Sequence, residues 1–220
     1  MAYQIHPDLS FCLFEGMPVF LDLKRDRYFA LGERLGRTFC GVLNGQAPPD
    51  LPADELVSQG ILSQVQGDAP PKPASVVLPH ESVPEMHHAT GGLMLALSIE
   101  IGAHILGVRR RMKRDGLAAA IDRQRKRNAS IAKREESRNS MAITLSRRFI
   151  SARRWVPIQP ICLADSLALL EFLGRRSVAA NLVIGVKMKP FAAHCWVQTD
   201  ETILNEEVGF ASTFKPILVA

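Results

Sequence analysis

The chain of 220 residues is poor in cysteine: it has four, and none stands at the paired spacing of a zinc or iron–sulfur site. Four thiols without a paired pattern also give no disulfide framework and suit a reducing compartment. No basic-then-apolar stretch opens the chain, because residues 1–10 contain neither Lys nor Arg. A secretory signal is therefore not indicated, and the cytoplasm is the expected location.

Long uninterrupted hydrophobic runs are also missing. The most apolar stretch, from Gly91 to Val108, is at the short end for a membrane span and is interrupted by Glu100 and His104. An acidic residue in the middle of a lipid-facing helix is costly. We therefore expect a helix that is buried or faces a partner, and no stable insertion in a membrane.

Negative charge is scarce in one segment. Residues 109–148 contain 14 Lys or Arg and 4 Asp or Glu, a local net charge of +10 (14 − 4) in a chain whose net charge is +5. Such a segment suits contact with nucleic acid, an acidic membrane surface or an acidic partner protein, but solvated helix faces are its ordinary explanation. Aromatic residues are absent from 107–148, so nothing there can stack on bases and nucleic acid is not an expected partner.

Proline marks a boundary in the chain. The segment 67–85 contains five prolines and few large apolar residues: Pro70, Pro71, Pro73, Pro79 and Pro84. It is expected to be an extended linker without a core of its own. Two domains, 1–66 and 86–220, are predicted on either side, and the apolar spacing over 86–150 predicts helices.

The first sixty residues contain three short apolar runs separated by turn residues: 11–14, 18–23 and 27–31. Each run predicts a strand. Helical spacing then extends from Leu35 to Leu43 and ends at Asn44-Gly45, and a second helical piece over 53–57 follows Pro52. Three strands followed by helices predict a small winged-helix-like module.

The second half contains the residues best suited to a reaction. Pro157 and Pro160 stop any helix from upstream, so Cys162 lies at the start of a helix-like segment over 162–176. The helix dipole and free backbone N–H groups lower the pKa of a thiol at that position. His194 lies downstream in a strand-like segment, and the order Cys then His is that of a cysteine–histidine nucleophilic site. The ordinary alternative is a buried thiol and a structural histidine.

A third group must orient the imidazole of His194. The next strand-like segment, 203–207, offers Asn205 as a neutral acceptor and Glu206 as an anion. Neighbours on a strand face opposite sides, so only one of the two can serve. For the same reason Cys195 points away from His194 and is expected to fill the core.

Five groups of residues together carry a resemblance to a known family: Cys162-Leu163, Ser166–Leu169, Gly185-Val186, Phe191 and Ala193–Val197. Their order and spacing resemble the transglutaminase-like cysteine peptidases of lasso-peptide biosynthesis over roughly residues 140–210. The resemblance implies a papain/transglutaminase-like α+β fold, with Cys162 as nucleophile and His194 as general acid and base. That family usually has an acidic residue on the strand after the histidine, which favours Glu206 over Asn205.

The front of the chain is similar to a second family. Leu21–Leu23 and Arg27–Leu31 resemble the PqqD-like leader-recognition domains of ribosomal-peptide biosynthesis. In that family an extended leader peptide adds a strand to an exposed sheet edge and packs against the last helix. The resemblance places a leader against these residues: Arg27, Tyr28, Phe29, Ala30, Leu31, Leu56, Val57 and Ile61. The alternative is that Tyr28 and Phe29 merely alternate between core and solvent.

The two resemblances imply one α+β protein. Residues 1–66 form a winged-helix-like leader-binding domain, 67–85 a linker, and 86–220 a peptidase domain with a basic helical N-terminal part. The implied activity is removal of the leader from a lasso precursor, beside an ATP-dependent lasso cyclase. ATP is needed, if at all, through that cyclase, and no metal or bound cofactor is expected. The alternatives are a transamidase of the same superfamily and a non-catalytic leader-binding scaffold.

Overall fold

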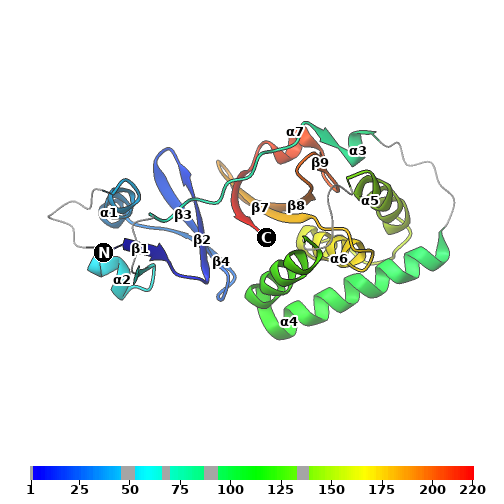
Figure 1. Ribbon diagram of the computed structural model, residues 1–220, viewed down its shortest axis with the longest axis horizontal. Coiled ribbons are helices and arrows are strands. Elements are labelled where there is room, and N and C mark those ends of the chain that lie inside the picture. Colours follow the sequence, from blue (N-terminus) through cyan, green and yellow to red (C-terminus); the bar gives the residue numbers. More distant parts are fainter. Residues whose placement is uncertain (1, 46–52, 66–69, 87–93, 133–138) are drawn as a thin grey trace. The chain divides into compact units, whose positions relative to one another are not determined.

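The structure is a computed structural model that describes residues 2–45, 53–65, 70–86, 94–132 and 139–220 (Figure 1). Contacts divide the chain into two compact units, Met1–Ser75 and Val76–Ala220. Both units combine helices and strands. Each has its own buried core.

The N-terminal unit consists of β1 (Ala2–Ile5), β2 (Leu9–Phe14), β3 (Met17–Asp22), β4 (Arg27–Ala30), α1 (Glu33–Leu43), α2 (Asp54–Ser58) and β5 (Leu62–Val65). Strands β2, β3 and β4 form an antiparallel sheet with β4 at one edge, and β1 pairs with β5 in a second antiparallel sheet. The predicted strands over 11–31 and the two predicted helices are confirmed. Strands β1 and β5 are short and far apart in the sequence, and were not predicted.

Aromatic rings fill the core of the N-terminal unit. Phe39 of α1 meets the rings of Phe11 and Phe20 edge-on, each with a centroid distance of 5.0 Å. Leu56 of α2 is fully buried in the same cluster. Its expected contact with a leader peptide is therefore wrong, because the inner face of this short helix is used to close the core.

The C-terminal unit consists of β6 (Glu81–Ser82), α3 (Val83–Met86), α4 (Leu95–Ala132), α5 (Asn139–Arg153), α6 (Cys162–Gly174), β7 (Asn181–Met188), β8 (Phe191–Gln198), β9 (Thr202–Ile203), α7 (Val208–Ala211) and β10 (Lys215–Val219). Its five-stranded sheet has the order β10-β7-β8-β9-β6, with β6 parallel to β9 and the other pairs antiparallel. Helix α6 packs on β7 and β8, and α4 and α5 pack against α6 (Figure 1).

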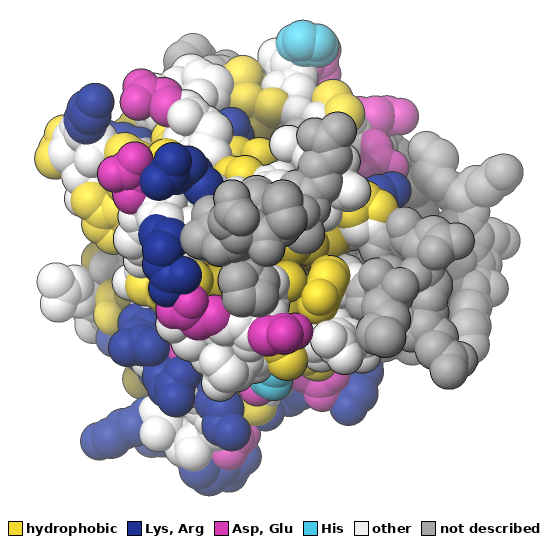
Figure 2. All heavy atoms as spheres, turned by 90° about the vertical axis from the view of Figure 1, so that its left-hand side faces the viewer, with side chains coloured by type: hydrophobic (Ala, Val, Ile, Leu, Met, Phe, Trp, Pro, Cys, Tyr) yellow, Lys and Arg dark blue, Asp and Glu magenta, His cyan; other side chains and the backbone are white. Residues whose placement is uncertain are grey.

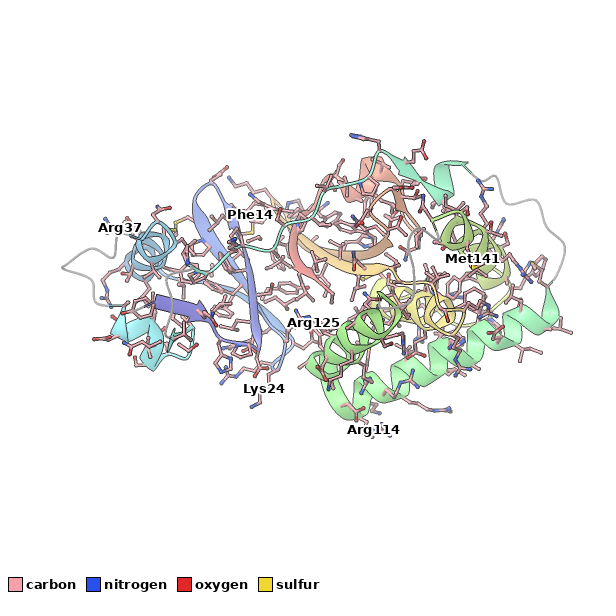
Figure 3. All side chains as sticks on the ribbon, in the orientation of Figure 1. Phe14, Lys24, Arg37, Arg114, Arg125 and Met141 are labelled. Atoms are coloured by element: carbon pink, nitrogen blue, oxygen red, sulfur yellow. The ribbon has the colours of Figure 1, made fainter. Side chains whose placement is uncertain are left out.

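Helix α4 is broken at Gly116, whose φ of 78° is a conformation that glycine adopts without strain. Ile101 and Ile105 before the break and Ile121 after it are fully buried. Arg114 and Arg125 belong to the two different halves (Figure 3). The predicted helices over 86–150 are confirmed where residues are described; 87–93 and 133–138 lie outside that part. Among the described helices none has the length and hydropathy needed to cross a bilayer.

The expected linker over 67–85 differs from the structure in its second half. The backbone N–H of Ala74 still donates to the carbonyl of Phe11 in the N-terminal unit (2.9 Å). Val76 and Leu78 already pack on the core of the other unit, and Ser82 is paired with Ile203. Proline keeps this segment extended, and its alternating apolar side chains then suit it to lie on a sheet edge.

Gly185 of β7 is paired with His194 of β8 and makes room for two aromatic rings. A Cβ atom at this position would lie 2.8 Å from Cβ of Phe214 and 2.9 Å from Cζ3 of Trp196. Both rings belong to the core beside His194. The missing side chain therefore helps to set the position of the histidine.

Replacing Gly185 by Ala should lower the free energy of unfolding by about 1–3 kcal/mol, because the new methyl group overpacks the core. Urea unfolding followed by tryptophan fluorescence measures this. Gly209→Ala is the matched control in the same unit, since a methyl group at that position would have nothing within 4 Å of it. Equal stability of the two variants would contradict the packing role of Gly185.

Candidate active site

Cys162 is the first residue of α6 and is exposed to solvent. Ile161 before it is extended, with φ −136° and ψ 117°, and accepts the first helical hydrogen bond from the N–H of Asp165 (2.9 Å). The N–H groups of Cys162 and Leu163 consequently have no partner carbonyl within the helix. The thiol lies where the helix dipole favours a negative charge.

Arg153 at the end of α5 fixes the loop that leads to Cys162. Its guanidinium pairs with Asp165 in the first turn of α6 (3.1 Å) and donates to the carbonyls of Val156 (3.1 Å) and Ile158 (2.8 Å). This role of Arg153 was not predicted from the sequence. Arg153 follows a basic segment, and nothing in the sequence around it indicates a particular partner. Its pairing with Asp165 depends on the packing of α5 against α6.

His194 lies on β8 and its Nε2 is 2.7 Å from Oε2 of Glu206. The side chains of His194 and Glu206 are 19% and 23% exposed, so the pair is largely shielded from water. Phe210 meets the imidazole edge-on at a centroid distance of 5.1 Å, and Phe214 lies at 5.5 Å. Since Nε2 is used by Glu206, Nδ1 is left to face the thiol of Cys162, with which the imidazole hydrogen-bonds.

Asn205 does not orient His194. Its Oδ1 accepts the backbone N–H of Val197 (2.7 Å), and its Nδ2 donates to Oγ of Ser166 (2.9 Å). Of the two alternatives that the sequence left open, the structure therefore pairs His194 with Glu206. The side chains of Asn205 and Glu206 thus have different partners, as expected of neighbours on a strand, although β9 has already ended at Ile203.

The thiol and the imidazole form an ion pair. The pKa of Cys162 is lowered to about 4, because hydrogen bonds from Cys195 and His194 outweigh the opposing effect of burial. Burial also opposes charge on His194, but hydrogen bonds with Cys162 and Glu206 raise its pKa to about 9. Thiolate and imidazolium therefore coexist between about pH 4 and pH 9, which is the state needed for nucleophilic attack at neutral pH.

Cys195 is buried, in agreement with its expected place in the core, but it also contacts the nucleophile. Its side chain is 4% exposed, and its Sγ is 3.8 Å from Oγ of Ser166. The hydrogen bond to Cys162 and burial together raise the pKa of Cys195 well above the usual range. This second thiol stays protonated, and the sequence pattern gave no sign of its contact with Cys162.

A groove follows the edge strand β4 of the N-terminal unit and has a volume of about 770 Å³. Five of the residues expected to contact a leader line it: Arg27, Phe29, Ala30, Leu31 and Ile61. Tyr28 and Val57 do not form part of its wall; Val57 packs against the core. The wall mixes apolar side chains with charges of both signs, among them Lys24, Arg25 and Asp8. Figure 2 shows a face of the molecule on which hydrophobic, basic and acidic side chains are likewise mixed.

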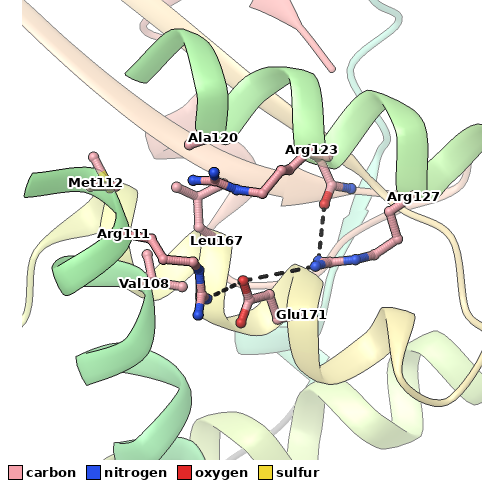
Figure 4. A pocket seen from close by; sticks show the side chains of 9 residues that line it. Val108, Arg111, Met112, Ala120, Arg123, Arg127, Leu167 and Glu171 are labelled. Atoms are coloured by element: carbon pink, nitrogen blue, oxygen red, sulfur yellow. Dashed lines mark hydrogen bonds and ion pairs between the residues drawn. The ribbon is translucent and has the colours of Figure 1, made fainter. Parts of the chain in front are cut away.

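Part of the basic segment is paired within the C-terminal unit. Glu171 of α6 accepts from Arg111 and lies 3.8 Å from a guanidinium nitrogen of Arg127 (Figure 4). Its carboxylate is also 3.4 Å from Nδ1 of His104. These contacts tie both halves of α4 to α6. Arg111 and Arg127 therefore have a structural role. No group of three metal-binding side chains occurs among the described residues.

The family model described as the transglutaminase-like superfamily matches residues 104–219, more than half of the chain. The chain therefore belongs to the transglutaminase-like superfamily. It is also similar to the microcin J25-processing protein McjB of Escherichia coli, with 42% identity over 45 residues.

That similarity covers 20% of this chain and 22% of the length of the microcin-processing protein. No solved structure matches the chain.

Replacing Glu206 by Gln should lower the pKa of His194 by about one unit or more, because an anion in contact with an imidazole favours its charged form. An NMR titration of histidine-labelled protein measures the midpoint. The matched control is Glu207→Gln, since Glu207 is exposed and contributes only its backbone N–H to Glu206. A midpoint that stays at about 9 in the Glu206 variant would rule out this role of the carboxylate.

Proposed function

We propose that this protein is a cysteine peptidase that removes the leader from a ribosomally made lasso precursor. The observation that carries the proposal is the Cys162–His194 ion pair with Glu206 on the second imidazole nitrogen, inside a transglutaminase-like domain. Such a domain is generally that of a cysteine peptidase or a transamidase. The similarity to a microcin-processing protein supports a lasso precursor as the substrate.

In the first half of the reaction the Cys162 thiolate attacks the carbonyl carbon of the last leader residue. The negative oxygen of the tetrahedral intermediate faces the free N–H groups at the start of α6. His194 gives its proton to the nitrogen of the first core residue as the C–N bond breaks. The core leaves with a free amino group, and the leader remains as a thioester on Cys162.

In the second half of the reaction, a water molecule takes the place of the core peptide that has left. His194, now neutral, takes a proton from the water as its oxygen attacks the thioester carbonyl. The C–S bond breaks, which releases the leader as a carboxylic acid and restores the thiolate–imidazolium pair. Glu206 fixes the imidazole tautomer and stabilises its charged form in both halves.

The groove along β4 is the proposed binding site for the leader. An extended peptide can add a strand at the edge of a sheet through backbone hydrogen bonds, and the side-chain pockets then supply specificity. The volume of the groove and the residues on its wall support this assignment. Capture at this site raises the effective concentration of the scissile bond at Cys162.

The expected partners are the precursor and an ATP-dependent lasso cyclase, which would receive the freed core. ATP is then required through the cyclase alone.

Two rival functions remain testable. A transamidase would pass the acyl group from Cys162 to an amine in place of water, and a scaffold would bind leaders without cutting them.

Mass spectrometry of a cognate lasso precursor tests the proposed reaction. The wild-type protein should cut once, between leader and core, and Cys162→Ala should abolish the cut. Each protein is incubated with and without the cyclase and ATP. Cys40→Ala, which removes the partly buried thiol of the N-terminal unit, should cut like the wild type.

An added primary amine distinguishes a transamidase from a peptidase. A transamidase would release the leader as an amide of that amine, which mass spectrometry tells apart from the free carboxylic acid. A precursor that binds but stays intact in every mixture would favour the scaffold and contradict the peptidase.

The groove is tested by a matched pair of tryptophan substitutions at exposed strand residues. Ala30→Trp on β4 fills the groove and should raise the Kd for the precursor at least about tenfold. Gln64→Trp on β5 lies outside its wall and should leave the Kd unchanged. Fluorescence anisotropy of a labelled leader measures both. Equal affinities would place the leader elsewhere.

A further inference from the structure

The first half of α4 presents one face to solvent that has no part in the reaction described above. Its other face is fixed within the C-terminal unit, where α4 packs on α5 and α6 (Figure 1). Ile101 and Ile105 on that inner face are fully buried. Oγ of Ser98 donates to the carbonyl of Ala152 in α5 (3.1 Å). The helix therefore cannot roll to bury its outer face without breaking these contacts.

The outer face forms a stripe in which exposed residues recur every three or four positions. In chain order these residues are Leu95, Ile99, Ala103, Leu106, Arg110 and Lys113, and we call them the α4 stripe. Residues at this spacing lie above one another on one side of a helix. At a rise of about 1.5 Å per residue, the stripe is about 27 Å long. It ends shortly before Gly116, where α4 is broken.

The α4 stripe is apolar at one end and basic at the other. Leu95 and Ile99 are 61% and 65% exposed, and Leu106 is 41% exposed. Arg110 and Lys113 continue the same line and are exposed as well. None of the six positions holds an acidic residue, so the charge of the stripe has one sign. Large apolar side chains that gather in this way mark a contact surface more clearly than scattered ones do.

Two kinds of partner suit a stripe that is apolar and basic: a protein face, and a lipid surface with anionic headgroups. A stable protein interface uses about 20–30 residues on each side, whereas the α4 stripe is a single row with three large apolar side chains. A lipid surface needs no such area. A few apolar side chains enter it while Lys and Arg stay at the level of the headgroups. The observations therefore favour the lipid surface.

We propose that the α4 stripe is a peripheral binding site for membranes that contain anionic lipids. Leu95, Ile99 and Leu106 enter the boundary between headgroups and acyl chains. Arg110 and Lys113 bind the phosphates of the headgroups, for which a one-signed basic end is complementary in charge. The helix stays on the surface of the bilayer, so this contact requires no membrane span.

Sedimentation of the full chain with lipid vesicles tests this site. One set of vesicles contains equal parts of phosphatidylcholine and phosphatidylglycerol, and the other contains phosphatidylcholine alone. The protein should bind the anionic vesicles at least about tenfold more tightly, because each Lys or Arg near an anionic surface favours binding. The difference should shrink at high salt concentration, since salt screens these charges.

The basic end is tested by combining Arg110→Gln with Lys113→Gln. This double variant should bind the anionic vesicles about tenfold more weakly than the wild type. The matched control combines Arg125→Gln with Lys126→Gln, which removes the same charge from exposed residues in the second half of α4. Because these two residues lie outside the stripe, the control should bind like the wild type.

The apolar end is tested by Ile99→Gln, which should weaken binding to the anionic vesicles about fivefold, because a polar side chain does not enter the acyl boundary. Val77→Gln is the matched control: Val77 is 80% exposed in the same unit but lies outside the stripe. It should bind like the wild type. Both side chains are exposed, so circular dichroism should show the same helix content in the two variants and the wild type.

Equal binding of the wild type to the two kinds of vesicle would overturn the proposal. Equal losses in the two charge variants, or wild-type binding by Ile99→Gln, would also overturn it. A wild type that ignores vesicles, together with an Ile99→Gln variant that loses affinity for the cyclase, would assign the stripe to a protein interface instead. Vesicle binding needs no precursor, so a protein that binds vesicles as expected but cuts no precursor would refute the peptidase and keep this site.

Discussion

The site depends on keeping two opposite charges in contact at a partly buried position. An unpaired thiolate or imidazolium would be costly to bury, so the ion pair of Cys162 and His194 is stable only while α6 and β8 hold the two side chains in contact. Several features of the fold serve this contact. Arg153 and Asp165 hold the start of α6, Gly185 lets the rings beside His194 pack closely, and Glu206 supplies the second anion.

The elements that carry the site could be read from the sequence, because their signals are local. Prolines upstream and apolar spacing downstream predict a helix that starts at Cys162, and the strand with His194 stands between clear turn residues. The third member could not be chosen between Asn205 and Glu206 from periodicity. That choice depends on how the chain bends after Ile203, and on tertiary partners such as Ser166 that lie far away in the sequence.

The sequence predictions that differ from the structure also failed because they depend on tertiary contacts. Leu56 was assigned to a binding surface because it lies on a helix near the edge strand, but a five-residue helix has few apolar residues with which to close a core. The expected linker was too long because proline content indicates an extended backbone and does not reveal what that backbone lies on. Many arginines of the basic segment look free in the sequence, whereas Glu171 already pairs with two of them.

The chain that joins the two units has a mechanical consequence. Ala74 is hydrogen-bonded within the N-terminal unit, and Val76 is packed within the other, so the covalent joint between the two anchored points is Ser75 alone. A joint of one residue has only a few rotatable backbone bonds. The strand just beyond it, β6, is paired with β9, three residues before Glu206. The segment after the joint thus becomes part of the same sheet as the strand that carries His194.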